Sequence, residues 1–163
     1  MNILFIFSRH SSEMNDSTLT KDLVDEFVRQ GNNVYIITMQ EKKNKQATKM
    51  AIENGSHVLR VRTGNYFGVS QLEKAITILS LPRQFVSAAR KFLSQIKFDL
   101  ILTHTPFVSS HRIIQPLRKL FACKAHLLLW DIFPQSAKDL GIIKTPWLFN
   151  RIAQILGACP RDG

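Results

Sequence analysis

The stretch Ile3-Leu4-Phe5-Ile6-Phe7, near the start of the chain, decides the fold. Five consecutive apolar residues are typical of a central strand in a parallel sheet, which helices cover on both faces. The polar residues 8–16 then predict a loop. Apolar residues recur at helical spacing over 19–28, Gly31 closes that helix, and a second apolar run occupies 34–38. This is a β-α-β unit, and its crossover should be right-handed.

The same alternation of strands and helices continues along the chain. Further strands are predicted at 57–62, 99–103 and 125–130, and helices at 72–79, 82–96, 109–121, 135–140 and 147–157. We expect the strand at 57–62 to lie on the edge side of the sheet. The lysine-rich residues 41–46 predict a solvated loop or the start of a mobile helix, and we expect Pro82 to begin a helix. The pattern predicts an α/β fold: a Rossmann-like doubly wound parallel sheet in three α/β/α layers, with strand order 3-2-1-4-5 or an extended form of it.

Length and composition restrict the class of protein. The 163 residues predict one domain, and 45% hydrophobic with 21% charged residues is typical of a globular chain. No apolar stretch is long enough to span a membrane, and the start resembles no secretory signal, so we expect a cytoplasmic protein. Cys123 and Cys159 have no zinc-ligand spacing, and the five histidines form no metal signature. We therefore expect no metal.

The net charge of +10 is unevenly distributed. Residues 1–62 hold nine bases and seven acids, whereas residues 63–163 hold thirteen bases and five acids. A basic half predicts an anionic neighbour: nucleic acid, acidic lipid headgroups or a phosphorylated substrate. A merely soluble basic surface is the alternative. No recognised nucleic-acid-binding pattern is present, so we expect no nucleic-acid partner.

A candidate site follows the last predicted strand, in Leu127-Leu128-Leu129-Trp130-Asp131-Ile132-Phe133-Pro134-Gln135. The apolar run, bounded by proline, predicts a buried interior strand. Asp131 would then stand at its carboxyl end, where open α/β sheets bind their ligands. Aspartate is also a good helix N-cap, and the two interpretations are compatible.

The loop after the first strand, Ser8 to Ser17, contains no glycine, and the chain has neither a dinucleotide fingerprint nor a P-loop. We therefore expect no nucleotide cofactor at this turn. The loop offers Arg9, hydroxyls, and an incipient helix N-terminus near Ser17 and Thr18, which could hold an anionic or sugar group. Ordinary capping by Asp16 or Ser17 is the alternative.

The strand at 99–103 is followed by His104 and Thr105, on the same carboxyl edge as Asp131. A histidine and an aspartate on adjacent strand ends could pair as base and orienting group, or could bind sugar hydroxyls. The alternative is a structural histidine. The segment 71–96 mixes bases with apolar residues, which suits either an interfacial helix on an anionic membrane or core packing with a solvated basic face.

Four segments resemble the N-terminal domain of family-4 glycosyltransferases, which have the two-domain GT-B arrangement. They are 1–6, 27–34, 98–102 and, most distinctively, 128–141, which is similar to a segment of bacterial enzymes that build capsule and O-antigen polysaccharide. Asp131 resembles the position where many relatives carry an active-site histidine. Asp16-Ser17 replaces a glycine pair of many relatives.

The resemblance implies that residues 1–163 are one GT-B half, which binds a lipid-linked sugar acceptor on a polyprenyl diphosphate at the inner membrane face. Asp131 would be catalytic, and Arg9, Ser17, Thr18, His104 and Thr105 would bind substrate. The nucleotide-sugar donor would need a second domain, which we expect this chain to lack. The chain is then either a truncated, inactive product or half of a two-chain enzyme. A membrane-associated, non-enzymatic subunit is the alternative.

Overall fold

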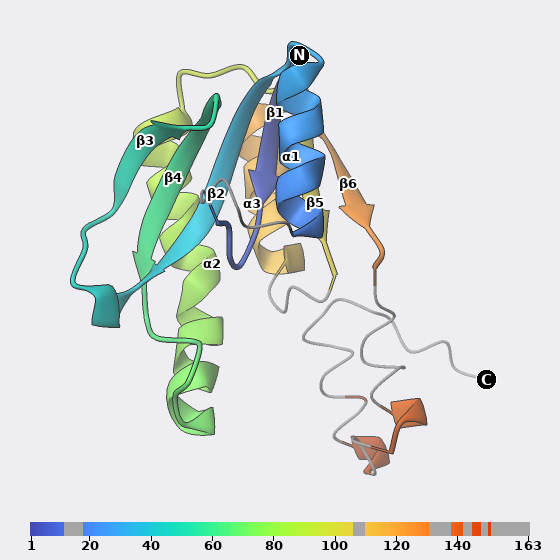
Figure 1. Ribbon diagram of the computed structural model, residues 1–163. Coiled ribbons are helices and arrows are strands. Elements are labelled where there is room, and N and C mark those ends of the chain that lie inside the picture. The colour runs from blue at the N-terminus through green and yellow to red at the C-terminus, as the bar shows by residue number, and fades with distance from the viewer. Residues whose placement is uncertain (12–17, 106–109, 131–137, 142–144, 148–149, 151–163) are drawn as a thin grey trace.

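The computed structural model describes residues 1–11, 18–105, 110–130, 138–141, 145–147 and 150. Within these residues, strands and helices alternate along most of the chain (Figure 1). The elements are β1 (Asn2–Ile6), α1 (Leu19–Arg29), β2 (Asn33–Glu41), the 3-10 turn η1 (Lys42–Asn44), β3 (Lys49–Glu53), β4 (Ser56–Thr63), α2 (Gln71–Leu93), β5 (Leu100–His104), α3 (Ser110–Phe121) and β6 (Lys124–Leu128).

The strands form a six-stranded sheet in the order β3-β4-β2-β1-β5-β6. Neighbouring strands run parallel except at the β3–β4 pair, which is antiparallel. β1 is central, and its Phe5 lies opposite Ile36 of β2 and Leu102 of β5. The five parallel strands follow the order 3-2-1-4-5 when they are numbered along the chain, so the predicted doubly wound topology is confirmed.

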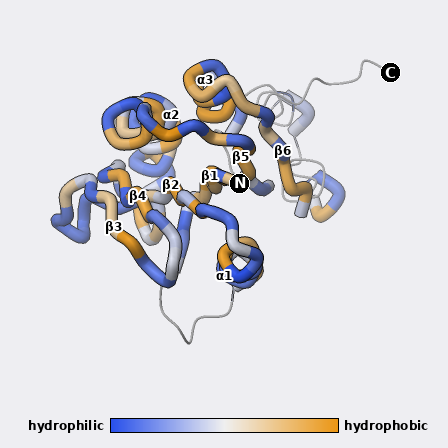
Figure 2. Tube along the Cα trace, turned by 90° about the horizontal axis from the view of Figure 1, so that it is seen from above, coloured by the Kyte–Doolittle hydropathy of each residue, from blue (hydrophilic) through white to orange (hydrophobic). Residues whose placement is uncertain are grey.

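Helices cover both faces of the sheet, as predicted. α1 lies on one face, while α2 and α3 lie on the other (Figure 2). β1 supplies side chains to both hydrophobic cores because successive residues of a strand point to opposite faces. Phe5 belongs to the core under α1, and Leu4 and Ile6 belong to the core under α2 and α3. The result is a three-layer α/β/α arrangement.

The predicted end of the first helix is confirmed. Thr18 is the N-cap of α1, and Gly31 follows the C-cap residue Gln30 with a φ of 78°. Glycine adopts this left-handed conformation without steric cost, which allows the chain to turn back into β2.

Three expectations about the secondary structure are wrong. β3 was not predicted, and it pairs outside β4, so the strand predicted at 57–62 is not at the edge. Pro82 lies inside α2 and does not begin a helix. The run that ends at Leu128 forms an edge strand of the described sheet, where Leu127 is 51% exposed, and not a buried interior strand.

The continuity of α2 through Pro82 follows from packing. Proline removes a backbone N–H donor, which normally interrupts a helix. Here buried side chains on both sides of Pro82, including Thr77, Leu81 and Phe85, hold the helix against the sheet. Burial of this stripe outweighs the local cost, so the two predicted helices are one helix of 23 residues.

Candidate functional site at the carboxyl edge of the sheet

Four rings follow one another along the carboxyl edge of the sheet. The His104 ring stacks on that of Trp130, with centroids 4.5 Å apart and planes 20° apart. The His104 centroid is also 5.4 Å from that of Phe7, and Phe7 stacks on His10 at 6.3 Å. These four side chains, which we call the aromatic row, come from the ends of β6, β5 and β1.

Thr105 locks together the ends of β5 and β6. Its backbone N donates to Leu128 O at 3.0 Å, and its Oγ1 accepts a hydrogen bond from Trp130 N at 3.0 Å. His104 Nδ1 lies 2.9 Å from Thr105 O. Because a carbonyl can only accept, Nδ1 carries the proton in this bond, and Nε2 of a neutral ring is left as an acceptor. The bonds of Thr105 therefore set the geometry of the His104–Trp130 stack.

Beside the aromatic row, a cavity of about 370 Å³ opens between the ends of β1, β2 and β4. We call it the edge cavity. Its lining includes Arg9 and His10 after β1, Glu41 and Lys43 at the end of β2, and Arg60 of β4. Since the carboxyl ends of parallel strands meet at one edge, residues far apart in the sequence converge here. The edge cavity is thus rich in cationic groups.

His10 is a buried member of both the aromatic row and the edge cavity, with 9% of its surface exposed. Burial lowers the pKa of this imidazole, and the nearby Arg60 guanidinium lowers it further, while Glu53 acts in the opposite direction. The ring is therefore neutral near pH 7. Its Nδ1 has no hydrogen-bond partner among the described residues.

Two of the cavity's three Lys and Arg side chains are held by carboxylates. Arg60 forms two hydrogen bonds with Glu53, at 3.0 and 2.6 Å, and Lys43 Nζ lies 3.1 Å from Glu41 Oε2. Within the described part of the chain, Arg9 is in no ion pair, and its guanidinium carbon lies 6.0 Å from the centroid of Phe67. Arg9 is therefore the cation of this cavity that can pair with a bound anion.

Glu41 ties the loop after β4 to the edge cavity. Its Oε1 accepts hydrogen bonds from the backbone N of Tyr66 and Phe67, at 2.7 and 2.9 Å. Burial alone would raise the pKa of Glu41, but these two bonds and the Lys43 ammonium outweigh burial, so the pKa lies below its usual value. The carboxylate is ionised at neutral pH and fixes the Phe67 wall of the cavity.

The structure brings together three of the six site residues predicted from the sequence. Arg9, His104 and Thr105 all lie at the carboxyl edge of the sheet. Thr18 caps α1, where its Oγ1 accepts a hydrogen bond from Lys21 N at 3.3 Å. Asp131 and Ser17 lie outside the described residues, so their roles and the pairing of His104 with Asp131 stay predictions.

Sequence reasoning missed His10, Phe7 and Trp130 as members of the site. Trp130 directly precedes the candidate Asp131, and His10 lies three residues beyond a buried strand, so both stand at strand ends. This position is the signal that could have identified them. The ring contacts themselves have no counterpart in local sequence, since Phe7 and His104 are 97 positions apart.

The described residues contain no group of three or more His, Cys, Asp or Glu side chains that could hold a metal ion. Among these same residues, no helix is long and apolar enough to cross a membrane.

The solved structures that are similar to this chain include that of CalG4, the calicheamicin glycosyltransferase. The sequence identity is 17%, and the TM-score is 0.49. The similarity covers 96% of this chain and 42% of CalG4, so this chain spans less than half the length of that protein. No protein-family model and no curated protein matches the chain. With this sequence identity and TM-score, the similarity gives no information about the activity of this chain.

Proposed function

We propose that this chain is the acceptor-binding domain of a glycosyltransferase, in which a sugar moves from a nucleotide sugar to a lipid-linked saccharide on a polyprenyl diphosphate. The role would be in surface polysaccharide synthesis. The resemblance of residues 128–141 supports the proposal, and one structural observation carries it: aromatic rings and cations lie side by side at the carboxyl edge of the sheet.

The aromatic row suits a sugar ring. The face of an aromatic ring carries partial negative charge, and the axial C–H groups of a pyranose carry partial positive charge, so the two surfaces attract each other. Trp130 is 39% exposed, and one of its faces is already covered by His104. The exposed part of the indole can accept an acceptor sugar, while Nε2 of His104 can accept a hydrogen bond from a hydroxyl.

The edge cavity suits the diphosphate of such an acceptor. Arg9 offers a guanidinium that can form two parallel hydrogen bonds to a phosphate, and Lys43 and Arg60 add positive potential. The cavity and the aromatic row share His10, so a sugar and its phosphate could be held at the same time.

The resemblance assigns the remaining roles. Asp131 would orient or deprotonate the acceptor hydroxyl, and Thr105, Ser17 and Thr18 would line the acceptor site. The donor would be supplied by a second domain or a separate chain. In an enzyme reconstituted with that part, Asp131→Asn should slow transfer more than about tenfold, the usual range for loss of a general base.

Acceptor binding can be measured on the chain itself. Trp130 and Trp147 are its two tryptophans, so Trp147→Phe leaves Trp130 as the fluorescent reporter. Titration with a farnesyl-diphosphate-linked hexosamine should change Trp130 emission in a saturable way. His104→Ala should weaken this binding by about tenfold, which corresponds to about 1.4 kcal/mol.

A matched control separates the site from general charge effects. His126 is an exposed histidine of β6, outside the aromatic row, and His126→Ala should leave acceptor binding unchanged. If the sugar-linked diphosphate and inorganic pyrophosphate bind with equal affinity, or if both histidine variants behave alike, the acceptor site is not at the aromatic row.

A second candidate function is a membrane-associated, non-enzymatic subunit that pairs with a donor-domain chain. The N-terminal half of α2 favours it, because it extends beyond the carboxyl ends of the strands (Figure 1). Leu72, Ile76 and Leu79 are 73%, 60% and 64% exposed there, with Lys74 beside them. An exposed apolar stripe flanked by bases is typical of a helix that lies on an anionic membrane.

Vesicle co-sedimentation tests this second candidate. The wild-type chain should bind vesicles that contain phosphatidylglycerol. Ile76→Gln combined with Leu79→Gln should reduce binding strongly, because it replaces two of the three apolar residues of the exposed stripe. Neutral phosphatidylcholine vesicles provide the control. Equal sedimentation of wild type and double variant would exclude α2 as the membrane-binding element.

A further inference from the structure

We propose that the groove between α2 and β4 is a second binding site, specific for a phosphate group and independent of the acceptor site. This groove, which we call the α2 groove, encloses about 550 Å³. It shares no lining residue with the edge cavity.

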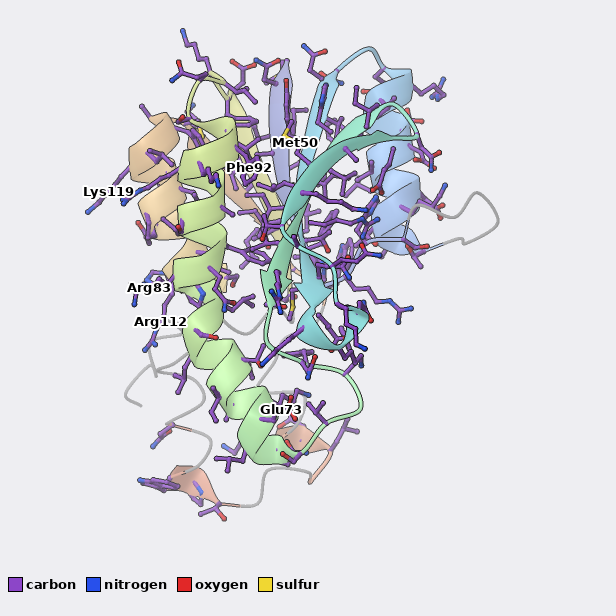
Figure 3. All side chains as sticks on the ribbon, turned by 90° about the vertical axis from the view of Figure 1, so that its left-hand side faces the viewer. Met50, Glu73, Arg83, Phe92, Arg112 and Lys119 are labelled. Carbon is purple, nitrogen blue, oxygen red and sulfur yellow. The ribbon has the colours of Figure 1, made fainter. Side chains whose placement is uncertain are left out.

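The α2 groove follows one side of the helix. Its polar residues Ser80, Arg83, Gln84, Ser87 and Lys91 recur at intervals of three and four, which places them along one side of α2. Figure 3 shows this helix beside β4 and β3, with Arg83 near its middle and Phe92 near its carboxyl end.

The space exists because small side chains occupy this side of α2. Leu81, Phe85 and Leu93 are fully buried and attach the helix to the sheet. Toward β4, by contrast, the helix presents Ser80, Ser87 and Ala88. Large apolar residues at these positions would fill the gap, so the hollow is a consequence of the side chains chosen there.

All charged side chains that line the α2 groove are positive. Arg62, Arg83 and Lys91 line the α2 groove, and no Asp or Glu does. In the part of the chain that the structure describes, none of these three cations is in an ion pair. This differs from the edge cavity, where Lys43 and Arg60 face carboxylates. Like charges that share a groove raise the affinity of that groove for an anion.

Hydrogen-bond donors complete the site. Thr48 Oγ1 accepts a bond from Arg62 N at 2.9 Å and keeps its own hydrogen for another acceptor. The Ser87 hydroxyl lines the same groove. Gln84 Oε1 is enclosed without a partner among the described residues. Gln84 lines the groove, and the NH2 group of its amide is a donor, so Gln84 can donate to a phosphate oxygen there.

This combination of groups suits a phosphate group. A guanidinium binds two phosphate oxygens at once, and an ammonium and two hydroxyls can occupy the others. The phosphate could belong to a soluble phosphate ester or to a lipid headgroup.

Calorimetry on the full chain at low salt tests the α2 groove. In an Arg9→Gln background, which removes the cation that we assign to the acceptor diphosphate, pyrophosphate should still bind saturably. Arg83→Gln combined with Lys91→Gln should weaken that binding by about tenfold. Both residues are exposed, so the fold should persist, and thermal unfolding checks this. The matched control is Arg112→Gln with Arg118→Gln, which removes the same charge from exposed positions of α3 and should change the affinity little.

A second measurement locates the ligand. In amide NMR spectra, the side-chain NH2 signals of Gln84 should move on addition of pyrophosphate, while those of Gln115 on α3 should not. Dihexanoyl phosphatidic acid, kept below its critical micelle concentration, distinguishes a lipid headgroup from a soluble phosphate ester as the source of the phosphate. Competition by this lipid supports a headgroup, and pyrophosphate binding without competition supports a soluble ester. Equal weakening by both variant pairs, or unmoved Gln84 signals, overturns the proposal.

Discussion

β1 and β6 are both five-residue parallel strands with mainly apolar sequences, but their burial differs greatly. From Ile3 to Ile6, every residue of β1 is at most 1% exposed. In β6, Leu127 is 51% exposed, and Leu129 just beyond the strand is 62% exposed. β1 has a strand on each side and helices over both faces, whereas β6 pairs with β5 alone within the described residues. An apolar run thus indicates a strand but not its place in the sheet.

The largest loss of stability is expected when a buried side chain of β1 is truncated. Phe5 is fully buried, and its ring lies 5.5 Å from that of Phe27 on α1. Phe5→Ala should lower the free energy of unfolding by about 3–5 kcal/mol, because it removes buried surface and leaves a cavity. Urea denaturation followed by circular dichroism measures this. A loss of only about 1 kcal/mol would mean that β1 is not the centre of the core.

A smaller effect is expected where β5 and β6 are joined. Thr105→Val keeps the shape of the side chain but removes the acceptor for Trp130 N, so it should cost about 0.5–1.5 kcal/mol. It should also alter the near-ultraviolet circular dichroism of Trp130 in a Trp147→Phe background.

Thr103→Val is the matched control for that change. It removes the bond from Thr103 Oγ1 to Ile6 O, at 3.0 Å, and should destabilise the protein without altering the Trp130 signal. If both variants change the signal equally, Thr105 does not specifically hold the His104–Trp130 stack.

The histidine after β1 should make stability depend on pH. The folded chain holds the pKa of His10 below 6.5, so the unfolded chain binds its proton more readily. This contribution to stability is fully present above about pH 6.5 and is lost as the pH falls toward the lower pKa of the folded state. His10→Gln should flatten the pH profile of unfolding. His126→Gln, at an exposed position on β6, should follow the wild type.

The smallest effect is expected on β6. Leu127→Gln replaces a half-exposed apolar side chain, so the free energy of unfolding should change by about 0.5 kcal/mol or less. Thermal unfolding of wild type and variant measures this. A loss comparable to that of Phe5→Ala would show that another part of the chain covers β6.

Much of the fold could be predicted from local patterns. The β-α-β unit from Ile3 to Ile37 was predicted because the helix carries its apolar residues on one face and ends at a glycine. β3 could not be predicted in the same way: Lys49 to Glu53 contains only two strongly apolar residues, Met50 and Ile52, and becomes a strand by pairing with β4. The site could not be predicted from local patterns either, because its ring contacts join residues that are far apart in the sequence, such as Phe7 and His104.

The sequence by itself determined the order of the five parallel strands, the topology of the parallel sheet and the edge at which candidate residues gather. These features depend on periodicity and on short connections, which are local properties of the chain. Only the tertiary structure decided which apolar runs are buried, that α2 continues through Pro82, and which rings and cations meet. Burial, stacking and electrostatic potential arise between residues distant in sequence, and their free energies depend on distances that the chain acquires only when it folds.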